Sequence, residues 1–166
     1  MLTEDLIQDK NMDASNLIKS IATEIQGSGG GQAFFATAGG SDPSGLDNSL
    51  NKLKEILFNW LQFEMKSSIC LDLFAGTGSI GIEAISRGSA KTIFVELNKR
   101  NYSQLSKILI SLDLKEQTKV YFKDAKTWIK NNDLSDFDLI FLDPPFGENY
   151  ELKILMDVLG GHGIVP

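Results

Sequence analysis

The sequence predicts an α/β fold in which a mostly parallel sheet is covered by helices on both faces. From residue 69 onward, short apolar runs alternate with segments of helical spacing, as in βαβ units. The runs are continuously apolar, which is typical of strands that are buried on both faces. Glycines and charged residues follow the runs where strands would end, and parallel sheets bind their ligands at that edge.

Size and composition are those of an ordinary soluble chain. The 166 residues, with 42% hydrophobic and 23% charged residues, suit one globular core. We find no apolar run near the roughly 18 residues that span a bilayer, and no secretory signal at the N-terminus. The single cysteine, Cys70, lies in an apolar run and is expected to fill a strand. Together these features favour the cytoplasm.

The net charge of −6 bears on the choice of partner. A protein that grips nucleic acid through its phosphates usually has a basic face. The acidic balance counts mildly against an autonomous nucleic-acid binder, although a local basic patch is compatible with it.

The first third of the chain differs in residue composition from the rest. Residues 3–26 have the apolar spacing of an amphipathic helix. Residues 27–45 are rich in glycine and small residues, which is typical of a flexible loop or linker. We therefore expect a domain boundary near residue 46, with a helix and a Gly-rich linker over 1–45 and the main domain over 46–166.

The main domain is predicted to begin with a helix capped by Asp47 or Ser49 and running to about Phe63. Strands and helices then alternate. The expected strands are 69–74, 91–96, 119–123, 137–142 and the start of a fifth at 163–166, and the expected helices are 80–86, 99–112, 125–131 and 150–159.

A glycine-rich turn follows the first strand and has the spacing G-x-G-x-x-G, beginning at Gly76. Such a turn either binds a cofactor or simply joins a strand to a helix, and dinucleotide enzymes share the spacing. Asp72, just before the turn, would repel a pyrophosphate but suits a cationic amino-acid group. The stretch from Asp72 through Phe74 to Gly78 resembles the first motif of Rossmann-like S-adenosylmethionine-dependent methyltransferases. By that resemblance, Gly76 and Gly78 pass under the methionine part of the cofactor.

Acidic residues end the next two strands. Glu96 is placed to accept both ribose hydroxyls of an adenosine, a geometry that nicotinamide enzymes share, or it is a solvated strand-end charge. In methyltransferases an acidic residue at the position of Asp124 accepts the adenine amino group, with help from the backbone of the next residue, here Ala125. Asp124 would serve equally well as a helix N-cap, and both roles remain open.

The fourth strand ends in Asp143, Pro144, Pro145 and Phe146. The sequence Asp-Pro-Pro-Phe resembles the catalytic motif of methyltransferases that act on exocyclic amino groups of bases. The lone pair of such an amine is delocalised into the ring, and the Asp143 carboxylate and Pro144 carbonyl can accept its hydrogens. Pro145 stiffens the turn, and Phe146 offers a face for base stacking. The alternative is a proline-rich turn without chemistry.

These motifs together resemble the bacterial 16S rRNA guanine-N2 methyltransferase family over about residues 50–166. The matching stretches are 57–61, 71–88, 94–96 and 137–146. The resemblance implies a cytoplasmic enzyme with a Rossmann-like class I methyltransferase sheet. It implies S-adenosyl-L-methionine as cofactor, and small-subunit rRNA or a ribosomal particle as partner. It also implies that Gly76, Gly78, Glu96 and Asp124 hold the cofactor and that residues 143–146 hold the target base.

The sequence departs from the family in three respects. It lacks the basic β-hairpin with which members begin, and the positions of an Arg-Pro-Thr segment read Asp47-Asn48-Ser49. It ends at residues 163–166, so we expect a sheet that is incomplete at its C-terminal end. An inactive remnant that binds S-adenosylmethionine is therefore a second hypothesis, and a nicotinamide oxidoreductase is a third. We find no spacing typical of a metal site and leave the oligomeric state open.

Overall fold

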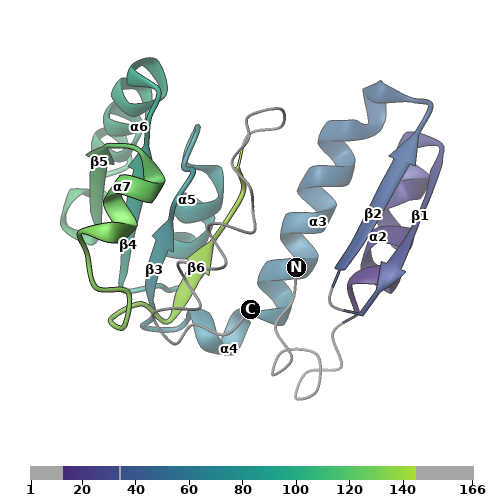
Figure 1. The fold of residues 1–166 in the computed structure, drawn as a ribbon, viewed down its shortest axis with the longest axis horizontal. Helices are drawn as coiled ribbons and strands as arrows, with labels where there is room; N and C mark the ends of the chain where they lie inside the picture. The colour runs from purple at the N-terminus through teal and green to yellow at the C-terminus, as the bar shows by residue number, and fades with distance from the viewer. Residues whose placement is uncertain (1–12, 34, 145–166) are drawn as a thin grey trace. The chain divides into compact units, whose positions relative to one another are not determined.

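A computed structural model of the chain describes residues 13–33 and 35–144 (Figure 1). The chain divides into two compact units, one ending at Leu61 and the other beginning at Gln62. The helix that we expected to open the main domain lies in the first of these units, and the expected domain boundary near residue 46 stays a prediction. None of the helices within these two described ranges is long and apolar enough to cross a membrane.

The first unit combines a two-stranded hairpin with two principal helices. The chain runs through α2 (Ala14–Ala22), η1 (Thr23–Ile25), β1 (Gly27–Gln32), β2 (Phe35–Gly40), η2 (Pro43–Gly45) and α3 (Leu46–Trp60). Asp13 caps α2, because its Oδ1 accepts the backbone N–H groups of Ser15 and Asn16 at 2.8 and 3.2 Å. β1 and β2 pair antiparallel, from Gly27 opposite Gly40 to Gln32 opposite Phe35.

The prediction of a flexible linker over the glycine-rich segment is wrong, because that segment forms the β1–β2 hairpin. Glycine usually weakens a strand, which is why the composition indicated a loop. Here its lack of a side chain is required for close packing. A Cβ on Gly27 would lie 2.0 Å from the Gly39 carbonyl oxygen, and one on Gly29 would lie 2.4 Å from Cγ2 of Ile18 in α2.

The prediction that Asp47 or Ser49 caps α3 is wrong, because this helix begins directly after Gly45, which is its N-cap. Ser49 is buried, and its hydroxyl instead donates to the carbonyl oxygen of Ile21 at 3.1 Å. Lys52 and Glu24 add an ion pair at 2.9 Å. These contacts attach α3 to the end of α2 and to η1, which explains why α3 belongs to the first unit.

The second unit contains a four-stranded sheet in which all strands are parallel, in the order β5-β4-β3-β6. The chain runs through α4 (Gln62–Met65), β3 (Ile69–Asp72), α5 (Ser79–Ser86), β4 (Lys91–Glu96), α6 (Lys99–Ser111), η3 (Lys115–Gln117), β5 (Thr118–Phe122), α7 (Ala125–Lys130) and β6 (Leu139–Phe141). The predicted α/β class with a parallel sheet is confirmed. The helix and strand predicted at 150–159 and 163–166 lie outside the described residues.

Helices cover both faces of this sheet (Figure 1). Successive side chains of β4 point to opposite faces. Val95 packs in a buried cluster with Trp128 of α7, whereas Phe94 packs in another with Leu105 of α6. Cys70 is fully buried in β3, where it fills the strand as expected.

Candidate active site

The strand order creates a crevice at the carboxyl edge of the sheet. From β3 the chain proceeds outward through β4 to β5, and β6 then returns to the other side of β3. Parallel sheets bind ligands where the strand order reverses in this way. A cavity of about 640 Å³ lies at this edge, within the usual range for small-molecule sites. It is lined by Asp72, Leu73, Phe74, Ala75, Gly76, Thr77, Ser79, Ile80, Val95, Glu96, Leu97, Asn98, Asn101, Lys123, Ala125 and Asp143.

The glycine-rich turn between β3 and α5 forms one wall of the cavity. Gly76 and Gly78 both have positive φ, +54° and +79°, which L-residues with side chains rarely adopt. Gly76 lines the cavity, and a Cβ there would meet only the Phe74 carbonyl oxygen at 3.9 Å. Gly78 does not line it, and a Cβ there would lie 2.3 Å from Cδ1 of the buried Leu105. The first two glycines of the motif therefore differ in role, since Gly76 leaves room for close approach at the cavity and Gly78 allows α5 to pack against α6.

Glu96 ends β4 and connects two walls of the cavity. Its Oε2 accepts the Gly76 N–H at 2.6 Å, and its Oε1 accepts the Asn98 N–H at 2.5 Å. The side chain is buried, so these bonds fix its position. Each carboxylate oxygen can accept a second hydrogen bond, so Glu96 still has capacity for two ligand donors.

Asp72 ends β3 and is only 2% exposed. Its Oδ2 accepts the Gly81 N–H of α5 at 3.3 Å. Burial raises the pKa of this carboxyl from 3.8 to about 7. The nearby charges of Asp143 and Glu96 contribute to this rise, and hydrogen bonds from the backbone of Gly81 and Phe74 oppose it. A cationic group entering the cavity would favour the ionised carboxylate.

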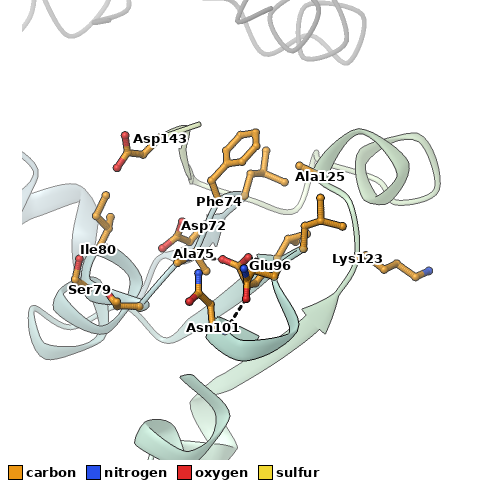
Figure 2. A pocket seen from close by; sticks show the side chains of 16 residues that line it. Asp72, Phe74, Ala75, Ser79, Ile80, Glu96, Asn101, Lys123, Ala125 and Asp143 are labelled. Atoms are coloured by element: carbon orange, nitrogen blue, oxygen red, sulfur yellow. Dashed lines mark hydrogen bonds between the residues drawn. The ribbon is translucent and has the colours of Figure 1, made fainter. Parts of the chain in front are cut away.

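Three strand ends thus contribute carboxyl groups to one cavity, Asp72 from β3, Glu96 from β4 and Asp143 after β6 (Figure 2). Such a cavity suits a positively charged ligand. Among the residues described, no three His, Cys, Asp or Glu side chains are arranged to hold a metal ion.

The predicted adenine contact involves Asp124 and Ala125. Asp124 caps α7, because its Oδ1 accepts the backbone N–H and the hydroxyl of Thr127, both at 2.9 Å. Its cap role is therefore observed. Ala125 lines the cavity and Asp124 does not, so an adenine contact through Asp124 stays a prediction.

Of the four predicted catalytic residues, the structure brings Asp143 to the cavity, where its side chain is exposed. Pro144 is described but does not line the cavity. Pro145 and Phe146 lie outside the described residues. Phe74, which we expected at the cofactor, also lines the cavity.

The sequence interpretation missed five polar residues of the cavity: Thr77, Ser79, Asn98, Asn101 and Lys123. Asn98 is the N-cap of α6, and its Oδ1 accepts the N–H groups of Arg100 and Asn101. Lys123 follows β5, and its backbone N–H donates to the Glu96 carbonyl oxygen at 3.1 Å. For Asn98 and Asn101 the sequence did contain a local signal. A helix that follows a strand-end carboxylate begins at the same edge of the sheet, so polar residues of its first turn are expected near that carboxylate.

Comparisons with known proteins give two family-model matches, which overlap over residues 44–59. The shorter is to the DHHA1 domain, whose family model matches residues 4–59. In addition, the alanine–tRNA ligase of Cytophaga hutchinsonii is 46% identical over 57 residues, which is 34% of this chain and 6% of the ligase. The similarity thus concerns a small part of that enzyme.

The longer match is to the family described as conserved hypothetical protein 95, whose model matches residues 44–165. The ribosomal RNA small subunit methyltransferase D of Haemophilus influenzae is 43% identical over 107 residues, 63% of this chain and 55% of that protein. A solved structure of a proposed methylase from the same organism is 36% identical, with a TM-score of 0.61, covering 70% of this chain and 73% of that one. The chain spans about half the length of the curated relatives it matches first. With its Rossmann-like sheet and this match over most of its length, the chain belongs to the conserved hypothetical protein 95 family.

Proposed function

We propose that the second unit binds S-adenosylmethionine and transfers its methyl group to the N2 amine of a guanine in small-subunit ribosomal RNA. One observation carries the proposal. Asp72, Glu96 and Asp143, from three strand ends, line one cavity at the point where the strand order reverses. The relatives named as ribosomal RNA small subunit methyltransferases support the class of substrate.

The residues of the cavity fit such a cofactor. Glu96 is held by two backbone N–H groups and has free acceptor capacity for the ribose hydroxyls. The buried Asp72 carboxyl suits the cationic methionine end, and Gly76, which has no side chain, would let that end approach the backbone. The backbone of Ala125 is available to the adenine ring, with Asp124 as its proposed second contact.

The bound cofactor supplies an electrophilic methyl group on a sulfonium. The protein must orient the acceptor amine, whose lone pair is delocalised into the base. The Asp143 carboxylate would accept a hydrogen bond from the amine, and we assign its second hydrogen bond to the Pro144 carbonyl, which would direct the lone pair toward the methyl group. As the N–C bond forms and the C–S bond breaks, S-adenosylhomocysteine would leave and one amine proton would pass to the Asp143 carboxylate. We assign base stacking to Phe146 and stiffening of the turn to Pro145. Orientation then supplies much of the acceleration.

The test is transfer of tritium from labelled S-adenosylmethionine to small-subunit rRNA, both as naked RNA and in ribosomal particles. Asp143→Ala is expected to lower the rate by about 100-fold or more, because it removes a positioned proton acceptor. Asp136→Ala, an exposed aspartate that does not line the cavity, is the matched control and should retain activity.

Nucleoside analysis of the product separates the parts of the proposal. N2-methylguanosine supports the assigned atom, and another methylated nucleoside overturns the assigned atom but not the enzyme class. A wild-type protein that binds S-adenosylhomocysteine and modifies neither RNA nor particles would instead be an inactive cofactor-binding remnant.

A further inference from the structure

We propose that Asn101 is a specificity-determining residue of the cofactor site, and that its side-chain amide donates a hydrogen bond to a ribose hydroxyl. Glu96 would accept the hydrogens of the same diol. The inference rests on the proposed function, which supplies the adenosine, and it adds a second group that reads the ribose.

Asn101 lies in the first turn of α6 and lines the same cavity as Glu96. Figure 2 shows its amide at the cavity, as it shows the Glu96 carboxylate. The backbone N–H of Asn101 is bound by the cap residue Asn98 at 3.2 Å. In the described part of the chain, neither polar atom of the Asn101 side chain has a hydrogen-bond partner, although the residue is partly buried.

The neighbouring Asn98 is engaged differently. Its Oδ1 accepts two backbone N–H groups of α6, which fixes its amide at the helix end. Asn101 is therefore the asparagine of this wall whose donor and acceptor are both unused. A ligand that fills the cavity would remove water from this amide, and the complex is weakened unless the ligand replaces the lost hydrogen bonds.

The chemistry of a ribose diol meets this requirement. A carboxylate can only accept hydrogen bonds, so each hydroxyl that binds Glu96 must donate its hydrogen to it. A hydroxyl that donates still has two lone pairs. Nδ2 of Asn101 can donate to one of them, so the carboxylate and the amide together recognise both functions of a hydroxyl. A deoxyribose lacks that partner and would leave the amide unpaired.

The experiment is calorimetric titration of the full chain with S-adenosylhomocysteine and with its 2′-deoxy and 3′-deoxy analogues. Asn101→Ala and Asn101→Asp should each weaken binding of the parent compound by about 5- to 10-fold, the worth of one hydrogen bond. Asn101→Asp has nearly the same shape but places a further carboxylate beside Glu96, so Asn101→Ala is the variant that reports the missing donor without added charge. Gln104→Ala, exposed on the same helix and away from the cavity, should bind as the wild type does.

The deoxy analogues distinguish a lost hydrogen bond from a general structural disturbance of the site, because a disturbance would weaken all the compounds to a similar extent. Removing the hydroxyl that Asn101 contacts should cost the wild type about 5- to 10-fold more affinity than it costs Asn101→Ala. Equal costs in both proteins, or wild-type affinity in either Asn101 variant, would overturn the inference while leaving the cofactor site intact. A folded wild type that binds no S-adenosylhomocysteine would overturn the proposed function, and this inference with it. Melting curves by circular dichroism show whether each variant is folded.

Discussion

Asp72 and Glu96 end neighbouring strands but differ in burial and in the hydrogen bonds that their side chains accept. Glu96 accepts two short backbone hydrogen bonds, at 2.5 and 2.6 Å. Asp72 is more deeply buried, and the N–H of Gly81 lies 3.3 Å from its Oδ2. Burial therefore dominates at Asp72 and raises its pKa to about 7. The free protein holds this carboxyl partly protonated near neutral pH.

The raised pKa of Asp72 predicts a pH-dependent stability. The folded state binds this proton more tightly than the unfolded state, whose aspartate has the usual pKa of 3.8. The contribution of Asp72 is therefore fully present below about pH 4 and is lost as the pH rises to about 7, with a slope of up to about 1.4 kcal/mol per pH unit. Asp72→Asn should remove this decline, as measured by urea unfolding across that range. Asp136→Asn should leave it unchanged, and an undiminished decline in Asp72→Asn would contradict the assignment.

At the level of elements, the turn between β3 and α5 is predicted to respond differently at its two glycines. Gly78→Ala combines a strained positive φ with a Cβ that overlaps Leu105, so we expect a loss of about 2 to 4 kcal/mol in unfolding free energy. In Gly76→Ala the added Cβ would make only an ordinary contact with the Phe74 carbonyl oxygen at 3.9 Å, so the change should cost only the strain, about 1 to 2 kcal/mol. Denaturant unfolding of both variants tests this order. Equal losses would mean that Gly78 does not pack against α6 as the structure shows.

The β1–β2 hairpin offers a similar comparison within one strand. A Cβ on Gly27 would meet the Gly39 carbonyl at 2.0 Å, whereas one on Gly30 would meet nothing within 4 Å. Gly27→Ala should therefore open the hairpin, and Gly30→Ala should change the stability by less than about 0.5 kcal/mol. Hydrogen exchange over residues 27–40 measures the effect directly. Fast exchange already in the wild type would return the segment to the flexible linker that the composition predicted.

Much of the sheet was predictable because its signals are local. Apolar runs and helical spacing placed β3, β4 and β5 within a few residues, and Asp72 and Glu96 were predicted at strand ends from their position alone. The hairpin was not predictable in this way. Its glycines are explained by contacts with Ile18 and with each other across the hairpin, which composition does not reveal.

The site shows the same division between local and tertiary information. Asn101 was predicted to lie in a helix, but its place on the cavity follows from where α6 begins relative to Glu96. The role of Gly78 also depends on a tertiary contact, with Leu105, and not on the spacing of the motif. Pro145 and Phe146 remain predictions from the motif.

At the scale of the whole molecule, the two units correspond to matches with two different families. The DHHA1 match covers residues 4–59, and the conserved hypothetical protein 95 match covers 44–165, so they overlap over most of α3. In the structure α3 belongs to the first unit, where Ser49 and Lys52 contact α2 and η1. The described residues that carry the proposed chemistry lie in the second unit.

The central claim is that this second unit binds S-adenosylmethionine through Glu96, and calorimetric titration with S-adenosylhomocysteine tests it most directly. We expect micromolar binding by the wild type and a loss of about 10- to 100-fold in Glu96→Gln, which removes the charge but keeps the size of the side chain. NAD should not bind. Absence of S-adenosylhomocysteine binding in a folded sample, equal affinity of Glu96→Gln, or saturable binding of NAD alone would contradict the account.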